Sequence, residues 1–150
     1  TGNQWSSEVV AYAESQGDQA LVISAKIEQE LSVLSEEDQN MFLEDLGITS
    51  SGLTRLSSVS FSLLGLQTFL TTGPKETHAW TIRQGDCAPQ AAGVIHTDFE
   101  KGFIRANVVS YDDFIKSKGF KEAKTSGLLR QEGKDYVMQE GDVVEFLFNV

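Results

Sequence analysis

The amino-acid sequence predicts an α+β protein in which a helical segment is followed by a mixed β-sheet wrapped over one helix. Three observations lead to this class. Apolar side chains recur at helical spacing across residues 24–64, strand-like runs separated by turn residues fill residues 67–148, and one apolar helix interrupts those runs at 89–95. We therefore expect two parts, residues 1–66 and residues 67–150.

The first part is predicted to hold one buried strand among helices. Residues 20–23 form a continuous apolar run, which is typical of a strand buried on both faces, and Ser24-Ala25-Lys26 then turns the chain into a helix. Helices are expected at residues 7–15, 24–34, 35–46 and 52–64. One strand-to-helix corner and two more helices are too little to close a sheet, so this part is predicted to be the tail of a larger α/β domain.

The second part is predicted to be a sheet with one crossing helix. Strands are expected at 67–71 and 75–82, joined by the turn Thr72-Gly73-Pro74, and again at 103–109, 128–130, 136–138 and 143–148, with short helices at 89–95 and 110–118. This order is that of the β-grasp, or ubiquitin-like, fold. The expected core residues are Trp80, Ile95, Ile104, Val108, Phe146 and Phe148.

Composition and charge narrow the function classes. The chain has 150 residues, is 40% hydrophobic and carries a formal net charge of −10. Residues 1–66 hold two basic side chains, Lys26 and Arg55, against ten acidic ones, whereas residues 67–150 hold ten basic against twelve acidic. The acidity therefore belongs to the first part, and only the second part has local basic clusters suited to nucleic acid.

Two further features concern the compartment. No apolar run approaches the roughly 20 residues that span a bilayer, so no membrane partner is expected. The lone Cys87 excludes an intrachain disulfide and is typical of a reducing compartment, which makes the cytoplasm the expected location. The chain opens without a methionine, and we expect it to be cut from a longer protein.

The residues predict no active site. The sequence contains neither a Gly-rich phosphate loop nor a dinucleotide fingerprint, and its two histidines and one cysteine do not form a spaced set of metal ligands. Asp98 and Glu100 are better explained as helix-capping groups than as an acid pair, and His78 as a packed or rim residue than as a general base. We therefore expect no catalytic residue and no metal ligand in this chain.

One long run carries a family resemblance. Residues 88–106, APQAAGVIHTDFEKGFIRA, closely resemble the signature of the TGS domain in the YchF/Obg-like ATPase family. Further runs agree in the same order: GLQTF and GPKE precede the signature, AWTIR leads into it, and GKDY and EGD follow it before the final FLFNV. The resemblance covers essentially all of residues 20–150.

This resemblance implies a nucleotide site that lies mostly outside the chain. In the family an N-terminal P-loop domain hydrolyses ATP, in preference to GTP, with Mg²⁺. Ser24, Ala25 and Lys26 match the fifth GTPase-type motif, which helps to hold the nucleotide base. A strand end that turns into a helix presents backbone N–H groups suited to such a contact. The phosphate loop and the magnesium ligands of the family would lie upstream of Thr1, so we expect this chain neither to retain ATP nor to hydrolyse it alone.

The resemblance also implies ribosome association through the TGS domain, at the large subunit or at ribosomal RNA. The candidate contacts are the basic side chains Lys101, Arg105, Lys116, Lys118 and Lys121, which could neutralise RNA phosphates. A solvated surface with lysines that only aid solubility is the alternative for the run 116–124. That run also departs from the family's Gly/Ala-rich pattern at Phe120 and at Leu128-Leu129.

Two other protein classes are alternatives. A β-grasp interaction or carrier domain that stands alone is one, although carriers need a flexible Gly-Gly tail and this chain ends in Asn149-Val150. The TGS domain of a threonyl-tRNA synthetase or a (p)ppGpp synthetase is the other, although in those proteins the domain lies away from the C-terminus.

Overall fold

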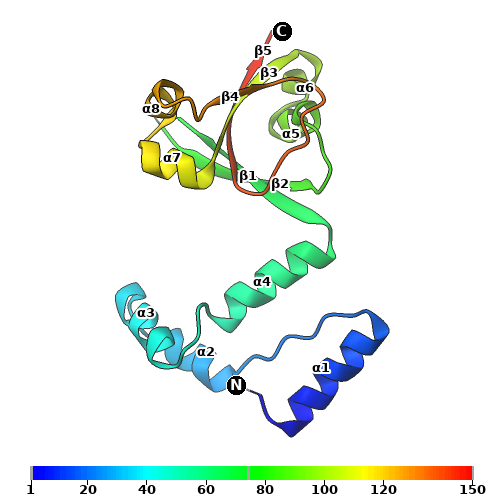
Figure 1. Ribbon diagram of the computed structural model, residues 1–150, viewed down its shortest axis with the longest axis vertical. Coiled ribbons are helices and arrows are strands. Elements are labelled where there is room, and N and C mark those ends of the chain that lie inside the picture. Colours follow the sequence, from blue (N-terminus) through cyan, green and yellow to red (C-terminus); the bar gives the residue numbers. More distant parts are fainter. Residues whose placement is uncertain (1, 74, 150) are drawn as a thin grey trace. The chain divides into compact units, whose positions relative to one another are not determined.

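A computed structural model describes residues 2–73 and 75–149, and the chain divides into two compact units. The first unit ends at Leu64 and the second begins at Gly65 (Figure 1). Each unit is described by itself. Pro74 of the expected turn and the terminal Val150 lie outside the described residues.

The first unit is built from helices. They are α1 (Gln4–Gln16), α2 (Ala25–Leu31), α3 (Glu36–Asp45) and α4 (Gly52–Leu63). Each follows a residue whose side chain accepts a hydrogen bond from a backbone N–H of the first turn, namely Asn3, Ser24, Ser35 and Ser51. Such N-caps satisfy donors that a helix leaves without an intrahelical partner, and they explain where the four helices begin.

The expected strand at residues 20–23 is wrong. In the structure residues 18–24 belong to no helix or strand, and Val22 and Ile23 are each 37% exposed. A strand exists only through hydrogen bonds to a neighbouring strand, and the described residues of the first unit contain no other strand to supply them. The apolar run therefore remains an extended connection between α1 and α2.

The first unit buries little apolar surface. Leu31 is its one buried apolar side chain among the described residues. Trp5, Val9 and Tyr12 of α1 are exposed, and so are Leu53, Leu56 and Leu63 of α4. Burial of apolar area is the main stabilising term in folding, so this unit has little core of its own.

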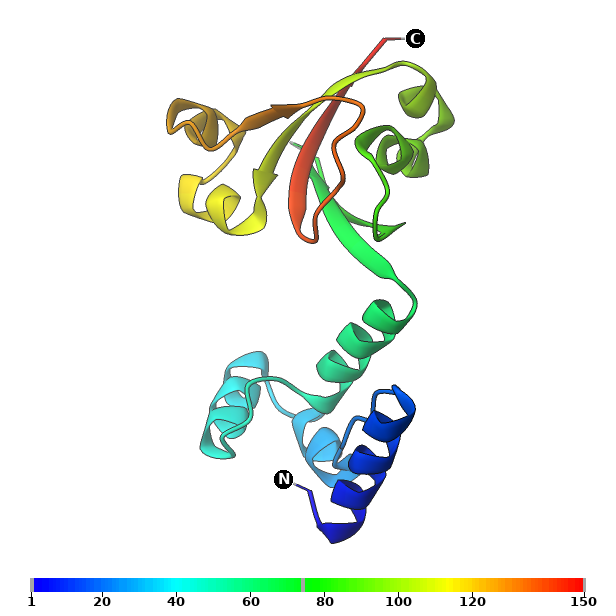
Figure 2. The same ribbon diagram turned by 45° about the vertical axis from the view of Figure 1, so that its right-hand side comes forward.

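The second unit is an α+β unit around one five-stranded sheet (Figure 2). Its strands are β1 (Leu66–Thr72), β2 (Thr77–Arg83), β3 (Phe103–Ser110), β4 (Arg130–Glu132) and β5 (Asp142–Phe148), and its helices are α5 (Ala88–Ile95), α6 (Thr97–Lys101), α7 (Tyr111–Ser117) and α8 (Phe120–Thr125). The strand order is β2-β1-β5-β3-β4. The sheet is mixed, because β1 pairs parallel with β5 while the other neighbours pair antiparallel.

The core lies between the sheet and α5. Ala88, Ala91 and Ala92 of α5 are buried against strand residues such as Phe69 and Val108. Three alanines on one short helix allow its backbone to approach the sheet closely, and larger side chains from the strands fill the remaining space. Trp80, Ile95 and Phe146 pack against this cluster as expected.

Four details of the second unit differ from the sequence prediction. Ile104 is exposed rather than part of the core, because a register irregularity between Phe103 and Arg105 changes the alternation of β3 at this point. Residues 136–138 form no strand and contribute only an isolated bridge between Cys87 and Val137. The expected strand at 128–130 begins two residues later, as β4, and α8 was not expected.

Candidate functional sites

The turn Ser24-Ala25-Lys26 lies at the start of α2. The Ser24 hydroxyl accepts a hydrogen bond from the Ile27 N–H at 3.4 Å, which makes Ser24 the N-cap and puts Ala25 and Lys26 at the first two helical positions. Backbone N–H groups at these positions have no partner within the helix. The turn can therefore offer N–H groups to an acceptor such as the edge of a nucleotide base. The Lys26 side chain is 84% exposed and pairs with Glu30 at 3.9 Å.

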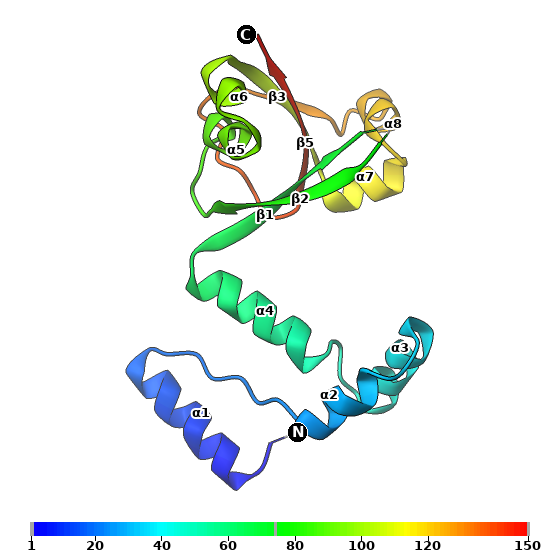
Figure 3. The ribbon, with the colours of Figure 1, turned by 180° about the vertical axis from the view of Figure 1, so that it is seen from behind.

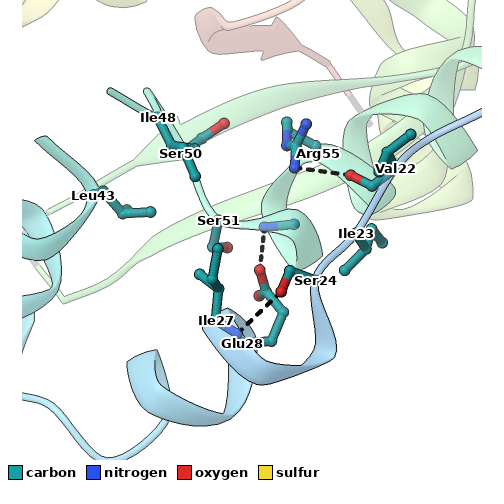
Figure 4. Close-up of a pocket in the computed structure, with 11 residues that line it drawn as sticks. Val22, Ile23, Ser24, Ile27, Glu28, Leu43, Ile48, Ser50, Ser51 and Arg55 are labelled. Carbon is teal, nitrogen blue, oxygen red and sulfur yellow. Dashed lines mark hydrogen bonds between the residues drawn. The ribbon is translucent and has the colours of Figure 1, made fainter. Parts of the chain in front are cut away.

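The N-terminus of α4 lies beside this turn (Figure 4). The Glu28 carboxylate accepts hydrogen bonds from the backbone N–H groups of Gly52 at 2.7 Å and Leu53 at 3.3 Å. A carboxylate at a helix N-terminus is favoured both by these donors and by the helix dipole. Glu28 thus caps a helix that begins 24 residues further along the chain.

Arg55 makes a second connection between α4 and the approach to the turn. Its Nη2 donates to the Val22 carbonyl oxygen at 3.2 Å (Figure 4). Its Nε is buried and has no hydrogen-bond partner among the described residues. Glu28 and Arg55 were not singled out from the sequence. The available signal was charge, because Arg55 is one of two basic residues in a strongly acidic segment.

A small hollow lies between these groups. Its volume is about 90 Å³, and its lining includes Val22, Ser24, Glu28 and Arg55. Sites that enclose a small molecule usually measure about 300–1,000 Å³. The hollow is therefore too small for a whole nucleotide, and the residues present fit at most the edge of a base beside the turn.

The candidate RNA contacts in the second unit fall on two sides of its sheet. Figure 3 and Figure 2 show α5 and α6 on one side and α7 and α8 on the other. Lys101 ends α6 and so belongs to the first side. Lys116 lies in the last turn of α7, Lys118 is its C-cap, and Lys121 lies in α8. All four lysines are exposed.

Arg105 belongs to the α7–α8 side. Ala106 and Val108 point into the core beneath α5, so the alternation of β3 directs Arg105 and Asn107 to the opposite face. Val109, on that same face, is fully buried, and α7 contacts both β3 and β5. The structure therefore groups Arg105 with Lys116, Lys118 and Lys121 on one side, which we call the α7–α8 side, and separates Lys101 from them.

Hydrogen bonds hold the exposed polar groups of this sheet face in place. Arg105 Nη1 donates to Gln131 Oε1 at 3.3 Å, and Gln131 Nε2 donates to Asn107 Oδ1 at 3.3 Å. Asn107 Nδ2 in turn donates to Glu145 Oε2 at 2.8 Å. The row spans β4, β3 and β5 and presents both charge signs, so the basic character of this side comes chiefly from α7 and α8.

A polar cluster around the buried Asp142 lies at the start of β5. The Tyr136 hydroxyl donates to Asp142 Oδ2 at 2.8 Å and accepts from Arg130 Nη2 at 3.0 Å, while the Asp142 side chain is 3% exposed. Burial and the hydrogen bond to Asp142 raise the pKa of Tyr136 to about 12. The Gln139 N–H also donates to Asp142 Oδ2, so the cluster fixes the loop before β5.

The described residues show neither a group of three or more His, Cys, Asp or Glu side chains able to hold a metal ion nor a helix long and apolar enough to cross a membrane.

The class defined by this fold is an α+β protein with a helical segment ahead of a mixed five-stranded sheet. A family model named YchF-GTPase_C, described as a protein of unknown function (DUF933), matches residues 66–149. The chain belongs to the YchF family, whose C-terminal part it matches.

Known relatives extend the match to the whole chain. The ribosome-binding ATPase YchF of Bacillus subtilis is 48% identical over 150 residues, which are 100% of this chain and 41% of that protein. Obg-like ATPase 1 of Rattus norvegicus is 45% identical over 98% of this chain and 37% of its own length. The structure of the Schizosaccharomyces pombe YchF GTPase superposes with a TM-score of 0.80 at 33% identity, covering 97% of this chain and 39% of that one. The chain thus spans about two fifths of the length of these relatives.

Proposed function

We propose that this chain acts as the C-terminal part of a ribosome-associated P-loop ATPase and that its second unit is the docking module. The observation that carries the proposal is the 48% identity, over the full 150 residues, to a protein named ribosome-binding ATPase. A ribosomal partner implies a cytoplasmic location.

The second unit is proposed to be a TGS domain of β-grasp fold. Its mixed sheet in the order β2-β1-β5-β3-β4, with the first and last strands parallel at the centre and α5 packed across one face, supports this assignment. In this arrangement the α7–α8 side is available to a partner.

The first unit is proposed to be the end of the nucleotide-binding domain. The turn Ser24-Ala25-Lys26 would contact the base through backbone N–H groups, and about 1 kcal/mol per such hydrogen bond is a reasonable contribution. In this proposal the phosphates and Mg²⁺ of ATP are held by other parts of the longer protein, where a phosphate loop supplies most of the affinity for a triphosphate.

Ribosomal RNA of the large subunit is the proposed docking partner, and the α7–α8 side is the proposed contact. Residues 111–125 carry four lysines against three acidic side chains. Asp112 and Asp113 lie in the first turn of α7, whereas Lys116 and Lys118 lie at its other end, next to α8. The charges are thus sorted, and the lysine-bearing end is the part suited to phosphate groups.

Ribosome co-sedimentation of the longer protein tests the docking proposal. The three lysines are reversed together, as Lys116→Glu, Lys118→Glu and Lys121→Glu. This variant should bind at least about tenfold more weakly near physiological salt, and its binding should depend less on salt. The reason is that a complex with fewer phosphate contacts releases fewer counterions when it forms. Arg105→Glu should have the same sign with a smaller effect. Glu36→Lys with Glu37→Lys, on the acidic α3, is the control and should not weaken binding.

Lys101→Glu is a separate arm, since Lys101 lies on the α5–α6 side. A loss of binding with Lys101→Glu alone would move the contact to the opposite side of the sheet. Unchanged binding in all of these variants would overturn RNA docking through this unit and favour a protein-interaction role.

A further inference from the structure

The first turns of α4 hold the chain on both sides of the Ser24-Ala25-Lys26 turn. Before the turn, Arg55 donates to the Val22 carbonyl, and after it, Glu28 caps the N-terminus of α4 (Figure 4). Each contact joins segments that are far apart in the sequence, 33 and 24 residues respectively. Two such contacts on one short stretch restrict both its position and its rotation relative to α4.

We propose that Glu28 and Arg55 form a clamp that holds the Ser24-Ala25-Lys26 turn in a fixed position relative to α4. A nucleotide base bound at the turn then also orders α4. Glu28 and Arg55 are positioning residues in this scheme, because they act through the turn and do not touch the base. The inference rests on the nucleotide contact proposed above.

Gly52 makes the close approach of the clamp possible. A Cβ atom at this position would lie 2.7 Å from Glu28 Oε1 and 2.8 Å from Ile23 Cγ2, both well inside van der Waals contact. Alanine generally favours a helix over glycine, so a glycine in the first turn of α4 is explained by the need for space rather than by helix propensity. The segments before and after the Ser24 turn thus both press against the start of α4.

The clamp matters because α4 leads directly into the second unit. The helix ends at Leu63, Leu64 is its C-cap, and Gly65, at φ 63°, connects it to β1. Any restraint placed on α4 therefore acts on the segment from which the second unit continues. A nucleotide at the turn would in this way affect, through α4, the segment that continues into the second unit, which is the proposed docking module.

The clamp itself can be tested on the nucleotide-free chain by NMR relaxation of backbone amides. Glu28→Ala should increase fast motion both at residues 22–27 and in the first turn of α4, because one contact fixes both segments. Arg55→Lys should do the same at residues 22–24. Glu37→Ala, an exposed carboxylate on α3, is the matched control and should leave these amides unchanged. Increased motion confined to the first turn of α4 would overturn the clamp.

Nucleotide coupling is tested on the longer protein with ADP as the probe. Ala25→Pro removes one backbone N–H of the turn, and proline is tolerated at the first position of a helix, so this variant reports on the base contact alone. Glu28→Ala should raise the Kd for ADP about tenfold, because the base must then order a turn that is no longer held against α4. It should also abolish the protection from hydrogen exchange that ADP confers on residues 52–58. Glu28→Gln keeps an acceptor oxygen and the shape of the side chain, and it should give an intermediate effect. It replaces Glu28→Ala in this test if Glu28→Ala proves unfolded.

The outcomes separate the two proposals. If Ala25→Pro weakens ADP binding while Glu28→Ala and Glu28→Gln leave both Kd and exchange unchanged, the clamp is wrong and the base contact stands. If Ala25→Pro has no effect on Kd, the base contact is wrong, and the clamp is judged by the relaxation of the nucleotide-free chain.

Discussion

The Tyr136 hydroxyl donates a hydrogen bond to Asp142, a carboxylate that is almost completely buried. A tyrosine in an unfolded chain ionises near pH 10, whereas burial and this hydrogen bond raise the pKa of Tyr136 to about 12 in the folded chain. The folded state therefore holds the proton more tightly. The resulting stabilisation is fully present below about pH 10 and is lost as the pH rises through about 12.

Tyr136→Phe should remove this pH dependence. It should also lower the free energy of unfolding at neutral pH by about 1–2 kcal/mol, because Asp142 loses a donor while remaining buried. Ultraviolet titration of tyrosinate and urea unfolding at several pH values measure the two effects. Tyr111→Phe is the control, since Tyr111 is 51% exposed, and it should leave the component near pH 12 in place. A titration component near pH 12 that survives Tyr136→Phe would contradict the assignment.

Lys118 is the non-glycine residue with a positive φ, at 61°, in the part of the chain that the structure describes. This left-handed conformation costs an L-residue with a Cβ roughly 1 kcal/mol, and the C-cap position usually selects glycine. Lys118→Gly should therefore stabilise the second unit by about 0.5–1 kcal/mol. Thermal unfolding is the measurement.

Lys116→Gly is the matched comparison, because Lys116 lies within α7, where glycine is unfavourable. It should destabilise by about 1 kcal/mol. If Lys118→Gly stabilises the fold and also weakens ribosome binding, the strained lysine is retained for its contact with the partner.

At the scale of the element, Gly102 connects α6 to β3 where no side chain fits. A Cβ atom there would collide with the backbone carbonyl oxygen of Asn149, and the Asn149 N–H donates to the Gly102 carbonyl at 2.8 Å. Since a backbone atom rather than a flexible side chain is in the way, Gly102→Ala should destabilise the second unit by about 1–3 kcal/mol. Chemical denaturation measures this. Gly133→Ala, which has no atom within 4 Å of the added Cβ among the described residues, should change stability little.

Elements with a local signal were predictable from the sequence. Pro89 near the start of α5 and the alternation of His78, Trp80 and Ile82 in β2 each fix an element through short-range chemistry, and both elements are present. The strand predicted at residues 20–23 is absent, because apolar content does not reveal whether a neighbouring strand exists to pair with. The strand predicted at residues 136–138 is absent. Met138 is buried in the core but belongs to a loop, and a buried apolar residue in a loop looks the same in the sequence as one in a strand.

The candidate site was predictable only in part. The Ser24 turn has a motif, whereas the clamp has none, because Glu28 and Arg55 act through contacts 24 and 33 residues away. Ordinary helical residues acquire such a role only through tertiary structure. The grouping of Arg105 with the α7–α8 side likewise depends on which face of β3 the core occupies.

At the scale of the whole molecule, the two units differ in how many apolar side chains they bury. The first has one buried apolar side chain among the described residues, Leu31, whereas the second has a continuous cluster around Phe69. Limited digestion with chymotrypsin should therefore degrade the first unit first and leave a fragment that begins near Gly65, because local opening exposes cleavage sites where few apolar contacts resist it. Mass spectrometry of the time course measures this. Equal rates of loss for both units would contradict it.

The chain alone should release no phosphate from ATP. Its sequence contains no phosphate loop, and the hollow beside the Ser24 turn, about 90 Å³, is too small for a whole nucleotide. A phosphate-release assay on the purified chain is the measurement, and the same preparation treated to remove contaminating ATPases is the control. Turnover that persists after this treatment would refute the expectation.

The buried cluster of the second unit comes from a single uninterrupted stretch of chain, between Phe69 and Val144. A gene segment that encodes this stretch and its flanking strand residues therefore encodes every residue of that core cluster. Such a segment can be duplicated, inherited or fused to an unrelated enzyme without any change inside it. Evolution can thus treat the sheet unit as a transferable part, and a protein engineer can append it to a reporter as a ready-made tag.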